Sequence, residues 1–268
     1  MKILLIGDVI GRPGRAIVEQ KLVGLRKELS LDFVVVNCEN AAAGAGITSS
    51  IADDLFRAGA DVLTSGNHVW KIKDAFELLK KDHRVLRPAN YPDTCPGSGS
   101  VVVESLGGQK VGVLNVMGRI FMEPLDCPFK TAAREVEKLR KETPIIIVDM
   151  HAEATSEKNA IGWFLDGKVS CVFGTHTHIP TADERILPKG TGFITDVGMT
   201  GPYDSVIGRR VDQILERFLT GMPHKSEVAD SNIQLRGLIV DVDPATGKAN
   251  RVERLTRKLD GPVSGSGD

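Results

Sequence analysis

Residues 169–178 read Val-Ser-Cys-Val-Phe-Gly-Thr-His-Thr-His, an apolar run that ends in a glycine and two histidines. Four other short apolar runs also end in polar residues or glycine, at residues 3–6, 33–36, 61–64 and 145–148. Between the first two runs, apolar residues recur at helical spacing, at Val18, Leu22, Leu25 and Leu29. Apolar runs that alternate with helical patterns are typical of a mainly parallel sheet with helices on its faces.

Three further helices are predicted from the same spacing. One begins at Ser49 or Ser50, either of which can cap it, and it buries Ile51, Leu55 and Ala58. The other two are marked by apolar residues at helical intervals, which are Ala132, Val136 and Leu139 in one and Val211, Ile214, Leu215 and Phe218 in the other.

Two segments predict antiparallel hairpins. Residues 101–103 and 111–116 flank Gly107-Gly108, a pair that supplies the positive φ angles of a turn. Residues 233–242 and 249–255 flank a Pro-Ala-Thr-Gly turn at 244–247. Hairpins among parallel units predict an α/β fold, a four-layer αββα sandwich with two facing mixed sheets. We expect residues 1–260 to form a single domain and residues 261–268 to form a flexible tail.

Composition limits the classes of function. The 268 residues carry 34 Lys and Arg against 35 Asp and Glu, a net charge of -1, which argues against a partner that is a polymeric nucleic acid. The four cysteines are scattered, which favours a reducing compartment. The apolar run at residues 3–6 is too short for a signal segment, and no run approaches a membrane span. These features predict a cytoplasmic, soluble protein without a membrane partner.

Chemistry-bearing side chains follow the predicted strands. They are Asp8, Glu39, Asn40, Asn67, His68, His151, His176 and His178. The carboxyl ends of parallel strands meet at one edge of a sheet, so these residues are expected to converge. Oxygen donors mixed with imidazoles suit first-row divalent metals such as Mn, Fe, Ni or Zn. The set exceeds what one four-coordinate ion needs, and two ions that share a bridging carboxylate would use it fully.

The histidine-containing motifs differ in how specifically they indicate a metal site. In an extended loop, the side chains of His176 and His178 point the same way and can reach two neighbouring ions, while Thr177 points elsewhere. In the triplet Gly66-Asn67-His68, Asn67 can bind a metal through its amide oxygen while His68 faces the substrate, but the triplet taken alone favours a turn, because Asn and Gly are turn formers. The remaining histidines, His83 and His224, are flanked by charged residues or proline and are interpreted as surface residues.

The glycine-rich stretch at residues 7–15 is only a weak match to a nucleotide-binding loop. Its spacing is G-x-x-x-G-x-x-G, and Asp8 would repel a pyrophosphate unless a cation intervened. Arg12 and Arg15 either contact a substrate phosphate or lie exposed at the surface. Cys38 is predicted to be a buried neighbour of the site and not a ligand.

The order of these strand-end residues resembles the calcineurin-like metallophosphoesterases and is most similar to their YmdB-like branch. The similarity runs from residue 2 to about residue 259 and includes Asn-Cys-Glu-Asn-Ala-Ala at 37–42 and Thr-Asp-Val-Gly-Met-Thr-Gly-Pro at 195–202. The sequence departs from the wider superfamily where Ile10 replaces a histidine, Glu39 replaces the bridging Asp, and Val69 replaces an acidic residue.

The resemblance implies a phosphoric diester hydrolase that acts on small phosphodiesters, including 2′,3′-cyclic nucleotides, with two divalent ions that are iron or manganese. It also implies the two ligand sets. One is Asp8, Glu39, Asn40 and His178, and the other is Glu39, Asn67, His151 and His176, with Glu39 bridging. The branch resembles proteins with regulatory effects on gene expression and biofilm behaviour.

The mechanistic hypothesis is that two ions about 3.5–4 Å apart share a hydroxide that attacks phosphorus in line. His68 then protonates the leaving ribose oxygen as general acid. Two rival interpretations stay open. One is a nucleotide-cofactor oxidoreductase that uses the loop at residues 7–14, and the other is a regulatory module that senses a cyclic nucleotide with negligible turnover. A homo-oligomer is possible, and residues 199–207 would line either a pocket or a subunit contact.

Overall fold

The computed structural model describes residues 1–260, so the predicted tail at residues 261–268 lies outside the described residues. The single domain over residues 1–260 stays a prediction. Strands and helices follow one another along the described chain as β1 (Lys2–Ile6), α1 (Gly11–Glu28), β2 (Phe33–Asn37), α2 (Ser49–Arg57), β3 (Val62–Thr64), α3 (Asp74–Lys81), β4 (Ser100–Glu104), β5 (Lys110–Met117), α4 (Pro128–Leu139), β6 (Ile146–His151), α5 (Thr155–Leu165), β7 (Cys171–Thr175), β8 (Arg185–Ile186), β9 (Gly192–Ile194), β10 (Gly201–Pro202), α6 (Val211–Thr220), β11 (Ile233–Val242) and β12 (Ala249–Lys258).

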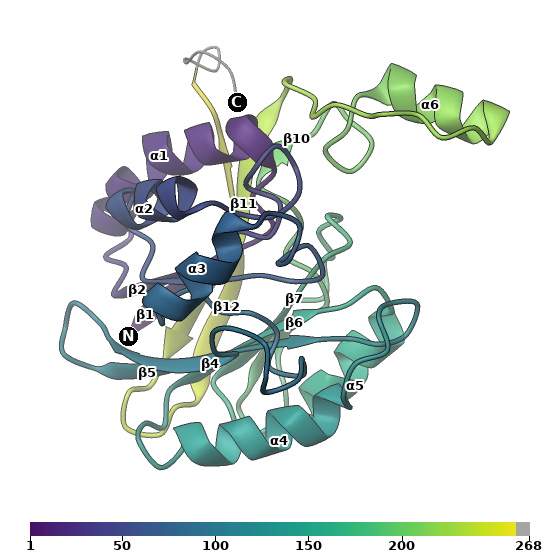
Figure 1. Cartoon of the computed structure of the whole chain (residues 1–268). Coiled ribbons are helices and arrows are strands. Elements are labelled where there is room, and N and C mark those ends of the chain that lie inside the picture. The colour runs from purple at the N-terminus through teal and green to yellow at the C-terminus, as the bar shows by residue number, and fades with distance from the viewer. Residues whose placement is uncertain (261–268) are drawn as a thin grey trace.

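Two mixed sheets carry these strands (Figure 1). In the first sheet β1, β2 and β3 run parallel, and β11 pairs antiparallel with both β1 and β12. In the second sheet β5, β6, β7 and β9 run parallel, with β4 and β8 antiparallel to their neighbours. The carboxyl ends of β1 to β3 and of β6 and β7 carry the predicted site residues, so both sheets contribute to one site.

The fold has four layers, which are two sheets between two layers of helices, and an apolar cluster lies between each pair of adjacent layers. The middle cluster fills the space between the sheets, where Leu5 and Phe33 pack with Val113 and Ile147. A second cluster joins the outer face of the first sheet to α1, α2 and α3, and a third joins the outer face of the second sheet to α4 and α5. Alternate residues of one strand serve different clusters, as the two-residue period of a strand requires. The predicted four-layer α/β sandwich is confirmed.

Two local predictions need correction. The cap of α2 is Thr48, whose hydroxyl accepts a hydrogen bond from the Ile51 amide at 3.3 Å, and not Ser49 or Ser50. Three neighbouring hydroxyl residues gave no way to choose between them by type alone. In the first hairpin only Gly108 has a positive φ, of 75°, because the five-residue loop needs one left-handed position.

Helix α6 forms where its apolar spacing predicts a helix, but it stands away from both sheets (Figure 1). Ile214 is its one buried residue, whereas Leu215 is 50% exposed and Phe218 is 76% exposed. The helical spacing of apolar residues predicts an apolar face, but it does not predict whether another part of the protein covers that face. Within residues 1–260, no helix has both the length and the apolar character needed to cross a membrane.

Candidate metal centre

The predicted site residues converge between the ends of the two sheets. From the first sheet come Asp8 after β1, Glu39 and Asn40 after β2, and Asn67 and His68 after β3. From the second sheet come His151 at the end of β6 and His176 and His178 after β7. His151 joins the two sides, since its Nε2 lies 3.1 Å from Glu39 Oε2 and 3.1 Å from Asn67 Oδ1.

Two groups of side chains have the spacing of a metal site within the described residues. One is Glu39, His151 and His176, and the other is Asp8, Glu39 and His178, with the ligand atoms of each group within 4.8 Å of one another. Glu39 belongs to both groups. A carboxylate has two oxygens, so one side chain can serve two ions at once.

The electrostatics of this cluster suit cations. Asp8, Glu39 and His151 are fully buried, and within residues 1–260 the Oδ1 atom of Asp8 has no hydrogen-bond partner. Burial raises the pKa of Asp8. Burial acts in the same direction on Glu39, but His151 and His68 outweigh it and hold the pKa of this carboxyl well below its usual range. The other oxygen of the Asp8 carboxylate, Oδ2, accepts from the backbone amide of His176 at 3.1 Å. Because a buried carboxylate oxygen without a donor is costly, the donor set fits divalent metal ions.

The hydrogen bonds of His151 fix which ring nitrogen faces the cluster. Its Nδ1 lies 2.9 Å from the hydroxyl of Thr175, and that hydroxyl donates its proton to Asp149 at 2.7 Å. Thr175 therefore accepts from His151 Nδ1–H, which leaves Nε2 toward Glu39. Burial lowers the pKa of His151, but the charge of Glu39 more than offsets it and raises the pKa to about 9. A proton on His151 Nε2 interacts with the Glu39 carboxylate. A metal ion bound by both side chains would replace this proton.

The loop after β7 aims His176 and His178 at different groups, but it is not extended as predicted. Both histidines have a positive φ, of 95° and 67°. His178 directs Nδ1 at the carbonyl of Ile207, 2.9 Å away, so that Nε2 faces the cluster. Thr177 turns away, as predicted, and its hydroxyl donates to Asp196 at 2.7 Å. The left-handed conformations, rather than strand alternation, separate the two imidazoles.

His176 has its Nε2 3.1 Å from the carboxylate of Glu153, which the sequence analysis did not single out. Its Nδ1 lies 3.1 Å from His151 Nε2. Burial and the neighbouring His151 lower the pKa of His176 to about 3, so the ring is neutral and keeps a lone pair for a cation.

The amide of Asn40 lies between two histidines. Its Oδ1 is 2.7 Å from His68 Nδ1, and its Nδ2 is 3.1 Å from both His178 Nε2 and Glu39 Oε1. The backbone amide of His68 also donates to Glu39 Oε2 at 3.3 Å. Asn40 therefore connects His68 to the group that contains Asp8 and His178.

A buried ion pair supports the loop from behind. Lys158 Nζ lies 2.6 Å from Asp196 Oδ2, and each side chain is 1% exposed. The same carboxylate accepts from Thr177 and, through Oδ1, from the amide of Gly198 at 2.7 Å. Sequence reasoning missed this pair, although Asp196 lies in one of the stretches that carry the family resemblance.

Gly66 allows the two ligand groups to approach the third strand closely. A Cβ atom at this position would lie 2.1 Å from His151 Nε2 and 2.2 Å from Glu39 Oε2. We expect Gly66→Ala to push these two candidate ligands apart and to reduce phosphodiester hydrolysis by at least about 100-fold, which activity assays together with metal analysis would measure. Gly24→Ala is the matched control, because nothing lies within 4 Å of its Cβ. Equal metal content and activity in the two variants would contradict this expectation.

The glycine-rich loop serves packing. A Cβ atom on Gly7 would lie 1.7 Å from the carbonyl oxygen of Gly198, and one on Gly14 would lie 2.4 Å from that of Thr200. The glycines therefore let the loop before α1 and the first turn of α1 lie against residues 197–200. Arg15 donates to the carbonyl of Ala41, which follows Asn40.

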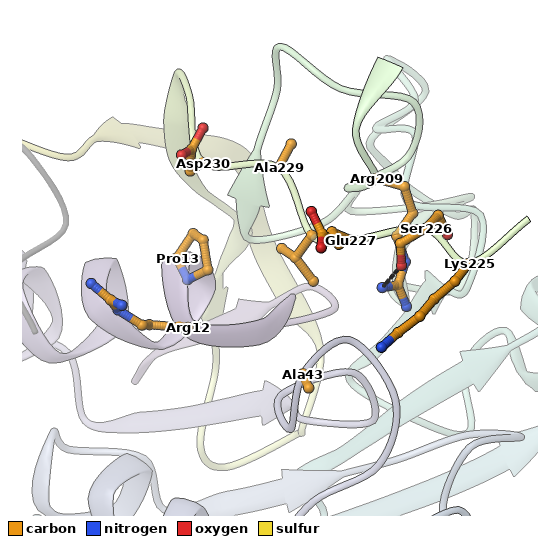
Figure 2. Close-up of a pocket in the computed structure, with 10 residues that line it drawn as sticks. Arg12, Pro13, Ala43, Arg209, Lys225, Ser226, Glu227, Ala229 and Asp230 are labelled. Atoms are coloured by element: carbon orange, nitrogen blue, oxygen red, sulfur yellow. Dashed lines mark hydrogen bonds between the residues drawn. The ribbon is translucent and has the colours of Figure 1, made fainter. Parts of the chain in front are cut away.

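A pocket of about 610 Å³ opens beside the start of α1 (Figure 2). Arg12 and Pro13 form one wall, and Arg209 and Lys225 reach in from the opposite side. Arg209 donates to the carbonyl of Gly44 at 2.8 Å, and burial lowers its pKa. Arg12 thus lines a pocket next to the loop that follows Asn40.

Of the other residues singled out, Cys38 is buried as predicted and contacts the carbonyl of Thr64 at 3.2 Å. Its burial raises the pKa of the thiol. His83 and His224 lie exposed at the surface.

Comparison with known proteins identifies the family. The family model described as YmdB-like protein matches residues 4–255. The chain belongs to the YmdB-like family. This YmdB-like protein is 46% identical to a 2′,3′-cyclic-nucleotide 2′-phosphodiesterase of Bacillus subtilis, over 95% of this chain and 96% of the relative.

Solved structures agree with this assignment. A hypothetical protein from Thermus thermophilus is 41% identical with a TM-score of 0.91, and the match covers 97% of this YmdB-like chain and all of the other. A structure described as a novel phosphatase from Mycoplasma pneumoniae is 37% identical with a TM-score of 0.90, over 98% and 95% of the two chains. The predicted family and the predicted enzyme class, a phosphoric diester hydrolase, are confirmed.

Proposed function

We propose that this YmdB-like enzyme is a metal-dependent phosphodiesterase that hydrolyses small phosphodiesters such as 2′,3′-cyclic nucleotides. The observation that carries the proposal is that Glu39 belongs to both groups of candidate ligands. The activity of the Bacillus subtilis relative supports the substrate class.

We assign one ion to Asp8, Glu39, Asn40 and His178 and the other to Glu39, Asn67, His151 and His176, with iron or manganese as the metal. Two divalent ions held there would lower the pKa of a nucleophilic water and neutralise charge on the phosphoryl oxygens. The protein contributes the spacing of the two groups, their burial and the tautomers of His151 and His178.

His68 is proposed as the general acid. For Asn40 to bind a metal through Oδ1, its amide must rotate by 180°, because Oδ1 faces His68 in the structure. The rotated amide directs Nδ2 at His68 Nδ1, which must then accept a hydrogen bond. Neutral His68 would consequently carry its proton on Nε2 and could donate it to the leaving ribose oxygen.

We expect His68→Ala to retain both metal ions and to lose activity on a 2′,3′-cyclic nucleotide by on the order of 10²–10⁴-fold. The loss should be smaller on a p-nitrophenyl diester, whose acidic leaving group needs no proton. Steady-state assays on both substrates measure the two losses. An equal loss on both would remove the role of general acid from His68.

The proposal is tested by stripping the protein with a chelator and reloading it with Mn(II) or Fe(II). Hydrolysis of a 2′,3′-cyclic nucleotide should vanish and return with metal. Two bound ions without turnover would instead favour the alternative, a regulatory module that senses a cyclic nucleotide.

We further propose a cytoplasmic location. Within residues 1–260 the cysteines, which are Cys38, Cys95, Cys127 and Cys171, are all free thiols, and this supports a reducing compartment. We also propose that the protein binds a small substrate and that it binds neither a polymeric nucleic acid nor a membrane. We further propose that it can form a homo-oligomer. Light scattering of the purified protein would test the oligomer.

A further inference from the structure

A buried polar cluster lies between the apolar core and the candidate ligands. Its four members come from four strands of both sheets and are fully buried, and they are Asn37, Thr64, Asp149 and Thr175. Each lies two residues after a member of the middle apolar cluster and therefore on the same face of its strand, after Val35, Val62, Ile147 and Phe173 respectively. The candidate ligands Glu39 and His151 lie two residues further along their chain segments, so the polar cluster separates the core from the metal centre.

Asp149 is the centre of the polar cluster. Its Oδ1 accepts from the hydroxyl of Thr175 at 2.7 Å, and its Oδ2 accepts from the side-chain amide of Asn37 at 2.9 Å. The hydroxyl of Thr64 donates to the same Oδ2 atom. Asn37 and Thr64 belong to the first sheet, whereas Asp149 and Thr175 belong to the second. One buried carboxylate therefore connects the two sheets next to the metal centre.

Packing alone does not explain a carboxylate at this position. Asp149 follows Ile147 on a face that packs against the middle apolar cluster, and apolar replacements of buried charges are often neutral or stabilising. A carboxylate, however, offers two acceptor oxygens and no donor, so it can accept hydrogen bonds from both sheets at once. The feature that Asp149 adds is thus a fixed set of hydrogen bonds and not stability.

Two chains of hydrogen bonds lead from Asp149 to candidate ligands. In the first, the hydroxyl of Thr175 donates to Asp149 and accepts from His151 Nδ1 at 2.9 Å. In the second, Asn37 donates to Asp149 through Nδ2, while its Oδ1 accepts from the backbone amide of Glu39 at 3.1 Å. His151 belongs to one group of candidate ligands and Glu39 to both. Both chains therefore end on the residues that join the two groups.

We propose that Asp149 is a positioning residue for the metal centre. Through Thr175 it orients the ring of His151, and through Asn37 it anchors the backbone of Glu39. The inference rests on the proposed function, in which these two side chains hold metal ions. Because the ligands come from both sheets, their spacing depends on a connection between the sheets, and hydrogen bonds behind the ligands keep them in the orientation that binds metal.

The Asp149→Asn variant breaks one of the two chains, because an amide has one acceptor oxygen and one donor nitrogen. With its nitrogen toward Thr175, the Thr175 hydroxyl loses its acceptor and turns its own proton toward His151 Nδ1. With its nitrogen toward Asn37, two NH₂ groups face each other, and Asn37 must turn a donor toward the amide of Glu39. We expect Asp149→Asn to bind Mn(II) about 10- to 100-fold more weakly, measured by calorimetric titration of the chelator-stripped full-length protein. Wild-type affinity in this variant would overturn the proposal.

The two threonines of the polar cluster provide a matched pair of variants. Both are fully buried and both donate to Asp149, but in the described chain the hydroxyl of Thr175 alone also contacts a candidate ligand. Thr175→Val should weaken one of the two Mn(II) sites about 10- to 100-fold, whereas Thr64→Val should keep the affinities of the wild type. Thr175→Ser retains the hydroxyl and should restore the affinity that Thr175→Val loses.

Thermal unfolding of the same metal-free variants separates positioning from a general loss of packing. Each Thr→Val substitution removes a buried hydrogen bond, so both should lower the Tm. A merely structural role would lower the Tm in both variants and change their Mn(II) affinities equally or not at all. Either of these results would overturn the proposal.

Metal titration requires no turnover, so the positioning role and the proposed function can fail separately. If the wild type binds two Mn(II) ions but hydrolyses no phosphodiester, the proposed function fails, and one weakened site in Thr175→Val still supports the positioning role. If the wild type hydrolyses a cyclic nucleotide and Thr175→Val binds Mn(II) as tightly as the wild type, the positioning role fails alone. A wild type that binds no Mn(II) would overturn both.

Discussion

The Glu39→Ala variant is expected to lose both metal ions and on the order of 1000-fold of kcat/KM on a cyclic nucleotide. Glu39 belongs to both ligand groups, so its removal leaves Asp8 as the one carboxylate of the proposed set. Two dications would then share a single negative charge among neutral donors, which does not offset their mutual repulsion. The contribution of bound metal to phosphoryl transfer is several kcal/mol, which corresponds to this loss of rate.

Glu153→Ala is the matched control for this prediction. Glu153 is also a carboxylate near the centre, but it contacts one ligand, His176, and is half exposed. Its loss should weaken metal affinity about 10- to 100-fold, as expected for a partner of a ligand, while saturating metal restores two ions. Metal analysis after gel filtration measures both variants. Two bound ions in Glu39→Ala would rule out the bridge.

The Asp196→Ala variant should destabilise the fold by about 3–5 kcal/mol, because it leaves the ammonium of Lys158 buried without its counter-ion. It also removes the acceptor of Thr177, between the two histidines of the loop. Metal binding should therefore weaken together with stability. Chemical denaturation of the wild type and the variant measures the free energy of unfolding.

The double variant Lys158→Met with Asp196→Ala separates a buried charge from a general loss of packing. Removing both charges should recover much of the stability, since an apolar replacement of a buried pair is often neutral. Asp212→Ala is a surface control, because Asp212 is 65% exposed in its pair with Arg210 and should change stability by less than about 1 kcal/mol. A double variant as unstable as Asp196→Ala would contradict the electrostatic explanation.

The candidate site was predictable from the sequence because strand topology gathers it. Asp8, Glu39, Asn67, His151 and His176 each follow or end a parallel strand, and parallel strands end at one edge. The four-layer fold followed from the same strands together with the hairpins. The fold and the position of the site depend on local sequence patterns and on a general packing rule, so both can be predicted from a single sequence.

The surroundings of the ligands could not be predicted in this way. Asp149 lies inside β6 and Thr175 ends β7, and neither residue type shows which side chain it will contact. Glu153 resembles an ordinary surface acid, and its contact with His176 depends on the left-handed backbone of that histidine. The exposure of α6 is likewise a tertiary property, because its apolar spacing is the same whether or not another surface covers it.

The pairing of β1 with β11 has a consequence for how the chain folds during synthesis. β1 lies between β2 and β11, and the amino group of Met1 donates to the carbonyl of Val242, 241 residues further along. Until the ribosome has released β11, the strand that leads to Asp8 has one unpaired edge, which invites pairing with other chains. Such distant contacts form slowly. We expect truncation before β11 to yield an aggregating chain, so β1, which is made well before β11, is among the last strands to be completed.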